Sequence, residues 1–319
     1  MTTIPTITGE IGLDDLGRTL VHEHVFVLGE EYRINYQDDW DEEEQVERAV
    51  AALEELRGLG FDTIMDPTVL GLGRYIPRIQ RIAERTSLQI LAATGLYTFN
   101  DVPHQFHYRG PGLMFDGPEP LTELFVKDLT VGIADTGVRA AFLKCAIDEP
   151  GLTPGVERVM RAVGQASVQT GAPITVHTNA ATQSGLVAQK VLADEGVDLR
   201  KVIVGHSGDS DDLDYLVQLA DAGSLLGMDR FGLDPWMDTE RRIDVIVELV
   251  RRGYAESIVL SHDAHCFMDF VPEDQLVAAL PNWNYVHIPR DVLPALLEKG
   301  VTEAQLETML VANVRRHFS

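Results

Sequence analysis

Short apolar runs alternate with amphipathic segments along almost the whole chain of 319 residues. The apolar runs are rich in Val, Ile, Leu and Ala and do not alternate strictly, which is typical of strands covered on both faces. Eight of these runs lie near residues 20–25, 61–66, 88–94, 139–145, 173–178, 201–206, 224–229 and 257–263. The repeated order of strand and helix predicts a parallel sheet, and eight units predict its closure into one (β/α)8 TIM barrel domain over residues 1–319.

The segments between the apolar runs carry helical signals. Residues 42–58 place apolar side chains at helical spacing behind an acidic first turn. Residues 153–169 begin with Thr153, a favourable N-cap, and Pro154 at the first helical position. Both segments are therefore predicted to be helices.

Two longer segments interrupt the repeat. Residues 98–118 are rich in aromatic side chains, Gly and Pro, and residues 264–285 follow the last predicted strand. We expect both to be loops at the active-site rim, where long loops form substrate walls.

Metal-binding residue types recur at the carboxyl ends of five apolar runs. They are His22, His24, Lys144, His177, His206 and Asp263. A β/α barrel builds its active site where the carboxyl ends of its strands meet, so we expect these side chains to converge. Nitrogen and oxygen ligands suit zinc, cobalt, manganese or iron, whereas calcium prefers oxygen alone. The spacing predicts a hydrolase centre with two divalent metal ions.

Strand parity sorts the residues around two of these ligands. His22 and His24 stand two positions apart, so both imidazoles would point into the barrel while Glu23 points toward the helices. The same parity turns Asp263 inward and His262 outward, toward a structural contact. The other histidines fall in predicted loops or helices and are interpreted as non-ligands: His104, His107, His265, His287 and His317.

Lys144 lies deep in an apolar run, where an unpaired ammonium is costly. A neutral amine there can react with carbon dioxide to give a carbamate, an anionic group able to bridge two cations. Two alternatives stay open at this point: an ion pair with a buried acid, and a lysine that forms Schiff bases.

The net charge of the chain limits the classes of molecule that it is expected to bind. With 50 acidic and 26 basic side chains the formal net charge is −24, which repels nucleic acid and anionic membranes and leaves small molecules as the expected substrates. The first residues lack a basic start followed by an apolar stretch, and no apolar run is long enough to span a bilayer, so we expect a cytoplasmic protein. Cys145 and Cys266 lack the CxxC spacing of zinc or redox motifs.

Longer motifs carry a resemblance to a known family. They read LVHEHVF, DPTVLGLGRYI, ATGLYTFNDVP, LKCAIDEPGLTPGVERV, ITVHTN, VGHSGDSDDLDYL, GMDRFGLD and LSHDAHC. Together they resemble the phosphotriesterase-like lactonases of the amidohydrolase superfamily almost from end to end. The resemblance implies a more buried metal on His22, His24 and Asp263, and a more exposed metal on His177 and His206. It further implies that carboxylated Lys144 and a hydroxide bridge both metals, and that Tyr97 and Arg230 flank the substrate.

The resemblance also implies a substrate class. True phosphotriesterases usually carry tryptophan where Tyr97 stands and a larger insertion after the seventh strand, whereas residues 231–240 are short here. We therefore expect lactones, above all N-acyl homoserine lactones, with slower hydrolysis of aryl phosphotriesters. The expected acyl channel is apolar and comprises Leu72, Phe99, Phe231, Leu233, Trp236, Phe267 and Phe270.

In the implied mechanism Asp263 accepts the proton released as hydroxide adds, and Tyr97 stabilises the developing oxyanion. The resemblance implies a homodimer, for which Tyr36, Trp40 and residues 97–108 offer candidate apolar surface. The alternatives are a dedicated phosphotriesterase and, more remotely, a metal-dependent nuclease or a ligand-binding barrel without activity. Related nucleases tend to place glutamate where Lys144 stands.

Overall fold

Eight parallel strands form a nearly closed barrel in the computed structural model, which describes residues 2–37 and 40–319. The strands are β3 (Thr19–Leu20), β5 (Thr63–Asp66), β6 (Gln89–Gly95), β7 (Phe142–Ile147), β8 (Ile174–Thr178), β9 (Val202–Gly205), β10 (Leu225–Met228) and β11 (Ile258–Leu260). The first and last strands meet where the Val21 amide donates to the Leu260 carbonyl across 3.4 Å. The predicted eight-stranded barrel is confirmed.

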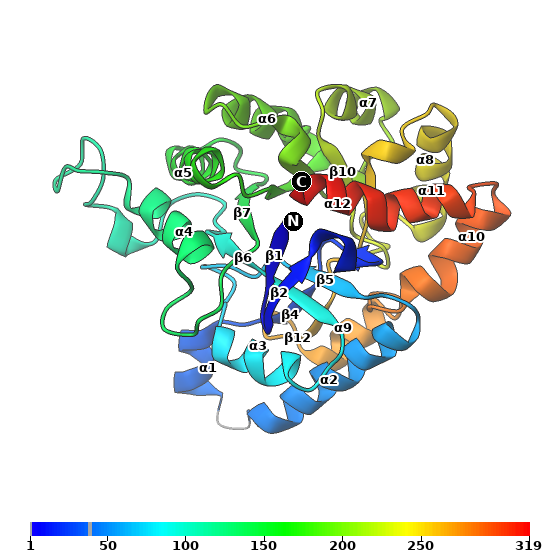
Figure 1. Ribbon diagram of the computed structural model, residues 1–319, viewed down its shortest axis with the longest axis horizontal. Helices are drawn as coiled ribbons and strands as arrows, with labels where there is room; N and C mark the ends of the chain where they lie inside the picture. The colour runs from blue at the N-terminus through cyan, green and yellow to red at the C-terminus, as the bar shows by residue number, and fades with distance from the viewer. Residues whose placement is uncertain (1, 38–39) are drawn as a thin grey trace.

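Helices surround the barrel (Figure 1). They are α2 (Glu42–Gly58), α3 (Ile76–Ala83), α4 (Pro120–Thr130), α5 (Pro154–Thr170), α6 (Ser184–Asp194), α7 (Leu213–Asp221), α8 (Thr239–Arg251), α10 (Leu293–Glu298), α11 (Glu303–Glu307) and α12 (Asn313–Phe318). Both helices predicted from the sequence are confirmed. Thr153 caps α5 by accepting from the amide of Val156, and Asp41 caps α2 in the same way.

The fold has two apolar cores. A large outer core fills the space between strands and helices, and a smaller inner core fills the barrel with side chains such as Met65, Phe142 and Val259. The hairpin of β1 (Thr3–Thr6) and β2 (Gly9–Gly12) and the helix α12 lie across one end of the barrel, with both termini in front of it (Figure 1). Ile4 and Phe318 join the inner core from these elements. This end is closed, so a site must use the opposite rim.

The first predicted strand, 20–25, is not continuous. β3 ends at Leu20 and pairs with β5, whereas β4 (His24–Val27) pairs with the short strand β12 (His265–Met268). The chain changes partner between the two, because the segment after β11 adds its own strand beside β4. The prediction of one uninterrupted first strand is therefore wrong.

Three of the other strand boundaries that differ from prediction bear on the site. β7 begins at Phe142 instead of residue 139, so Lys144 is its third residue and does not lie at the carboxyl end. β9 ends at Gly205, one residue before His206, and β11 ends at Leu260, three residues before Asp263. Lys144 reaches the rim through its long side chain, whereas His206 and Asp263 belong to the turns beyond their strands.

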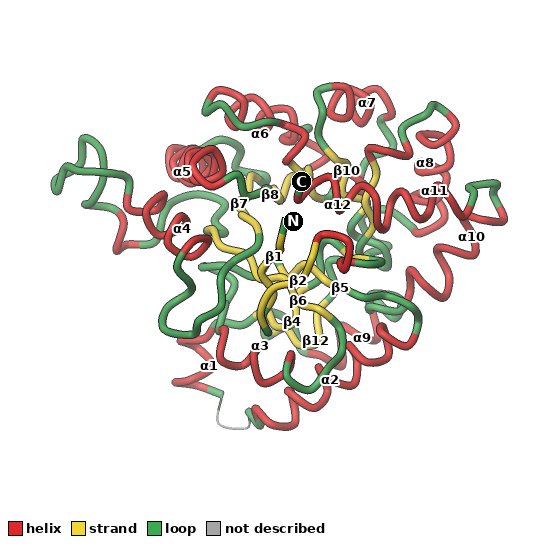
Figure 2. Tube along the Cα trace, viewed as in Figure 1, coloured by secondary structure: helices red, strands yellow, loops and turns green. Residues whose placement is uncertain are grey.

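The two long segments are only partly loops. Residues 264–285 contain β12 and α9 (Glu273–Ala279), so the prediction of a loop there is wrong in part. Residues 98–118 contain a short 3-10 turn, and the part before α4 extends away from the barrel (Figure 2). Phe106 is buried in the outer core, which anchors this segment against the helices.

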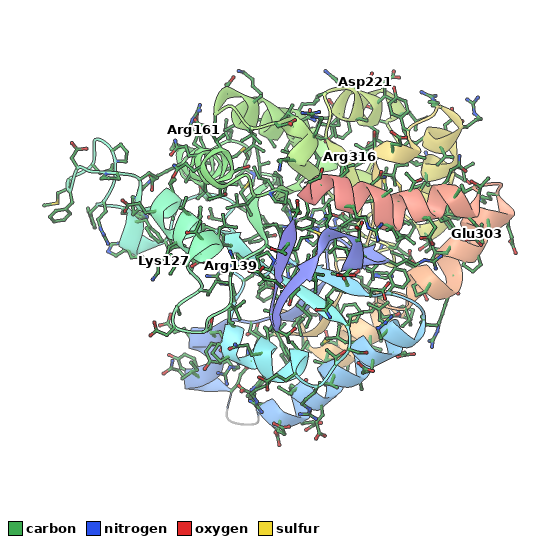
Figure 3. All side chains as sticks on the ribbon, in the orientation of Figure 1. Lys127, Arg139, Arg161, Asp221, Glu303 and Arg316 are labelled. Atoms are coloured by element: carbon green, nitrogen blue, oxygen red, sulfur yellow. The ribbon has the colours of Figure 1, made fainter. Side chains whose placement is uncertain are left out.

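The outer surface carries charged side chains, including Lys127 on α4, Arg161 on α5 and Asp221 on α7 (Figure 3). No helix in the described part of the chain is both long and apolar enough to cross a bilayer.

The apolar surface suggested for a two-fold contact is only partly exposed. Trp40 is half-buried and packs against Phe26 and Phe267, with ring centroids 6.2 and 4.9 Å away, so only part of its side chain is open to a contact. Tyr36 is exposed on α1 (Glu30–Tyr36), together with Tyr32. In the other candidate segment, residues 97–108, Phe99 and Tyr108 are exposed as well. The homodimer stays a prediction, with α1 and this segment as its candidate surfaces.

Candidate metal centre and active site

The six side chains singled out in the sequence meet at the open rim of the barrel. Strand parity accounts for two of them. Phe142 belongs to the inner core, so Lys144, two positions along β7, also faces inward. His177 points inward from β8 by the same argument, because its neighbour Val176 packs in the outer core.

His22 and His24 converge on one oxygen of Asp263. The Nε2 atoms of both imidazoles lie 3.3 Å from Asp263 Oδ1. Lys144 Nζ lies 3.1 Å from His22 Nε2. His22, His24 and Asp263 form a group that could hold a metal ion.

His206 and His177 form a second group of donors. His206 Nε2 lies 2.8 Å from His177 Nδ1 and 3.9 Å from Asp263 Oδ2. The other ring nitrogen of each imidazole contacts a carboxylate: His206 Nδ1 lies 3.0 Å from Asp229 Oδ1, and His177 Nε2 lies 2.7 Å from Asp148 Oδ2. If those nitrogens donate, the two facing nitrogens both carry lone pairs, which repel unless a cation lies near both. This arrangement fits a metal site.

Asp229 organises the buried side of the centre. Its carboxylate accepts from His22 Nδ1 at 2.8 Å and from the backbone amide of His206 at 2.7 Å, in addition to the His206 ring. The side chain is fully buried. Sequence reasoning missed this residue, although the signal was present: Asp229 is two positions beyond the inward-facing Gly227 in the motif GMDRF.

Two further residues orient the remaining imidazoles. Thr68 Oγ1 lies 2.7 Å from His24 Nδ1 and donates to Asp66 Oδ1. Asp148, which follows β7, contacts the His177 ring and also accepts from the side-chain amide of Asn179 at 2.8 Å. Sequence reasoning assigned no role to Thr68 or Asp148, because the contact of each with its histidine joins two different strands.

Burial favours the neutral form of the nitrogen donors, which is the form that binds metal. It lowers the pKa of Lys144 to about 8 and that of His177 to about 4, against the attraction of nearby carboxylates. The pKa of His206 also lies well below its usual value because of burial. Burial would raise the pKa of Asp263, but attraction to His22 and a hydrogen bond with His24 hold it well below its usual value.

Two of the six residues adopt left-handed backbone conformations. His206 has φ 62° and Asp263 has φ 56°. Such a conformation costs a non-glycine residue on the order of 1 kcal/mol, so neighbouring contacts must maintain it. The left-handed conformation directs each side chain back toward the barrel axis just after its strand ends.

Tyr97 and Arg230 contact different residues of the centre. The Tyr97 hydroxyl is 3.3 Å from His177 Nδ1, and burial raises the pKa of this tyrosine well above its usual value. Arg230 Nε lies 3.2 Å from Asp263 Oδ2, and Arg230 Nη1 lies 2.8 Å from Asp209 Oδ2. The structure thus places both residues beside the six ligand candidates.

The predicted acyl-channel residues separate into two sets. Leu72, Phe231 and Leu233 are buried, with 5, 0 and 4% of their surface exposed, and Phe267 packs on Trp40. Leu72, Phe231 and Leu233 therefore pack in the core, and their assignment to an open channel is wrong. Phe267 is half-buried, and its place in the channel stays a prediction. The side chains of Phe99, Trp236 and Phe270 are exposed. Phe99 stacks near Tyr97 and His177, with ring centroids 4.9 and 5.4 Å away.

His262 points away from the six residues, as strand parity predicts. Its Nε2 accepts from the Ile288 amide at 2.9 Å, which assigns the ring proton to Nδ1, 2.7 Å from Glu23 Oε1. In the described residues, the groups that could hold a metal ion are His22, His24 and Asp263, and His22, His206 and Asp229. The other histidines belong to neither group: His104, His107, His265, His287 and His317.

The chain resembles known proteins over its full length. The model of the phosphotriesterase family matches residues 2–318. A phosphotriesterase homology protein of Mycobacterium tuberculosis is 55% identical, with 100% of this chain and 98% of the relative covered. An aryldialkylphosphatase of Saccharolobus solfataricus is 37% identical, with 96% of each chain covered. The solved structure of the phosphotriesterase from Mycobacterium tuberculosis superposes with a TM-score of 0.98 at 55% identity, covering 100% of this chain and 98% of that one.

Proposed function

This chain belongs to the phosphotriesterase family of metal-dependent hydrolases, and on that premise we propose that it opens lactone rings with a binuclear metal centre. The leading substrates are N-acyl homoserine lactones, and aryl phosphotriesters are slower substrates. The observation that carries the proposal is the convergence of four imidazoles, one lysine and one aspartate at the open rim.

The donor set divides between two divalent cations. His22, His24 and Asp263 would hold one cation, and His177 and His206 would hold the other. Imidazole and carboxylate ligands suit zinc, with cobalt, manganese or iron as alternatives. Two such cations supply hydroxide near neutral pH and polarise the carbonyl or phosphoryl oxygen under attack.

Lys144 is proposed to carry a carbamate that bridges the two cations. In the described residues its Nζ contacts an imidazole nitrogen of His22, not a carboxylate. The ion pair with a buried acid, one of the alternatives considered from the sequence, therefore has no support in this geometry. Conversion of the Lys144 amine to a carbamate would place an anion beside His22, where it could bind the two cations.

The chain's own residues then handle the proton and the developing charge. Asp263 accepts a proton from the attacking water and delivers it to the leaving oxygen. Arg230 fixes the second oxygen of Asp263 from one side, and a guanidinium does not give up its proton, so it positions this carboxylate without competing for the proton. The Tyr97 hydroxyl donates a hydrogen bond to the oxyanion.

Lactones fit these groups better than phosphotriesters. In a lactone the leaving alkoxide stays tethered and is a poor leaving group, so ring opening needs a proton for the ring oxygen and a donor for the carbonyl oxygen. Asp263 and Tyr97 meet these two needs. The exposed rings of Phe99, Trp236 and Phe270 offer apolar contact for an acyl tail.

A dedicated phosphotriesterase is the second candidate. It is favoured by the name of the 37% identical relative, aryldialkylphosphatase. The two candidates differ in the substrate for which the centre provides more transition-state stabilisation.

The test compares both substrates on one preparation of zinc-loaded protein. Proton release reports the opening of an N-acyl homoserine lactone, and chromophore release reports cleavage of an aryl dialkyl phosphate. We expect kcat/KM for the lactone to be at least about tenfold higher, a difference of about 1.4 kcal/mol. A preference for the phosphotriester would replace the lactonase by the dedicated phosphotriesterase, and activity on neither would remove both.

A further inference from the structure

Glu23 lies between two proposed ligands, His22 and His24, yet it faces away from them. Its side chain is fully buried. Oε1 accepts from Ser261 Oγ at 2.8 Å, from the His262 amide at 2.9 Å and from His262 Nδ1 at 2.7 Å. Oε2 accepts from the Ala264 amide at 3.0 Å. In the described part of the chain no lysine or arginine pairs with it, so these donors are what stabilise the buried carboxylate.

The two backbone donors flank Asp263. One carboxylate oxygen binds the amide before Asp263 and the other binds the amide after it. Backbone amides on either side of a left-handed residue form a concave anion-binding turn, and the anion in turn fixes the φ and ψ of the residue between them. Asp263 has φ 56°, a conformation that needs this kind of support.

The same contacts extend to the segment after α9. His262 uses its second ring nitrogen to accept from the Ile288 amide, and its carbonyl accepts from Trp283 Nε1 at 2.9 Å. The Glu23 carboxylate therefore bonds directly to the turn around Asp263 and is connected to residues 283–288 through His262.

We propose that Glu23 is a positioning residue that sets the conformation of Asp263 through the flanking amides and so fixes this ligand before metal arrives. The inference rests on the proposed metal site. It assigns a role to a residue that does not contact the reacting groups.

The first experiment measures Glu23→Gln without relying on turnover. Glutamine keeps the size of the side chain but turns one acceptor into an NH2 donor, which must then face the Ala264 amide or the three donors at Oε1. We expect the dissociation constant for at least one zinc ion, measured by chelator competition, to rise tenfold or more. We also expect faster amide exchange in residues 261–264 of the metal-free variant.

Glu54→Gln is the matched control. Glu54 also accepts from an amide and from two hydroxyls, those of Ser87 and Thr86, but on the outer surface. The Glu54→Gln variant should bind zinc with wild-type affinity, and its residues 261–264 should show wild-type amide exchange. If Glu23→Gln does not give folded protein, Glu23→Asp provides the same test, because the shorter side chain cannot reach both flanking amides.

Wild-type zinc affinity in Glu23→Gln or Glu23→Asp would overturn the proposal. Full exposure of residues 261–264 to exchange in the metal-free wild type would overturn it as well, since the contacts must exist before metal binds. The proposed function is tested separately: a wild type that binds zinc but opens no lactone removes the lactonase and leaves the role of Glu23 intact.

Discussion

The inner and outer halves of the site are built differently. On the inner side His22, His206 and Asp229 are almost fully buried, and Asp229 contacts both of these imidazoles. On the outer side Phe99 and Trp236 are exposed, and the latter contacts the site through the Arg230 guanidinium, 5.8 Å from its ring centre. Hydrogen bonds thus fix the proposed metal ligands on the inner side, whereas the exposed aromatic side chains on the outer side are available for the proposed contact with the substrate.

The largest effect is expected from Lys144→Ala on the inner side. Removing the proposed bridge should cost most of the bound metal and at least about a hundredfold in kcat/KM, or about 2.7 kcal/mol. Short carboxylic acids such as formate should partly restore both by occupying the vacated position. Metal analysis of the purified variant, with Lys190→Ala on the surface of α6 as control, checks this. Two retained metals with full turnover would remove the carbamate from the proposal.

A smaller loss should follow from Asp229→Asn, which leaves the proposed ligands themselves in place. The amide cannot accept from both rings and the His206 backbone as the carboxylate does, so both imidazoles lose their orientation. We expect zinc affinity to fall by about ten- to a hundredfold, as is typical for groups that orient metal ligands. Asp128→Asn is the control, because Asp128 is also buried but accepts hydrogen bonds from Thr94 and Arg74, away from the six residues. An equal loss of zinc affinity in both variants would mean that general destabilisation is the cause.

Tyr97→Phe tests a residue that lies between the two halves, next to His177 on one side and Phe99 on the other. Loss of the hydroxyl should lower kcat/KM for lactone opening by about tenfold, or about 1.4 kcal/mol, and affect phosphotriester cleavage less. An aryl oxide leaves readily and depends less on hydrogen-bond assistance. Parallel assays with both substrates and measured zinc content give the ratio. Equal losses on both substrates would mean that Tyr97 only shapes the site and does not stabilise the oxyanion.

The smallest effect is expected from Trp236→Ala on the outer side. The side chain is 62% exposed, so its removal should leave stability and zinc content unchanged. The preference for long over short acyl tails should fall by about threefold, less than 1 kcal/mol. Met114→Ala, which truncates an exposed side chain on the segment before α4, is the matched control. A loss of bound metal in Trp236→Ala would contradict the separation of the two halves.

The sequence by itself determined the architecture and singled out the candidate donor set. Apolar runs of strand length alternate with amphipathic helices, and this pattern has a direct solution in a barrel whose strands are buried on both faces. His22, His24, Lys144, His177, His206 and Asp263 could be singled out because each is a polar residue within or just after an apolar run. Local pattern alone carries that information.

The tertiary structure decided which groups support those residues. Asp229, Glu23 and Thr68 act on side chains or amides from other strands, and no spacing along the chain records such contacts. The same limit explains the misplaced residues: Leu72 and Phe231 are apolar in sequence whether they line a channel or fill the core. The turns at His206 and Asp263 are a further example. The His206 amide bonds to Asp229, just after β10, and the amides that flank Asp263 bond to Glu23, just before β4.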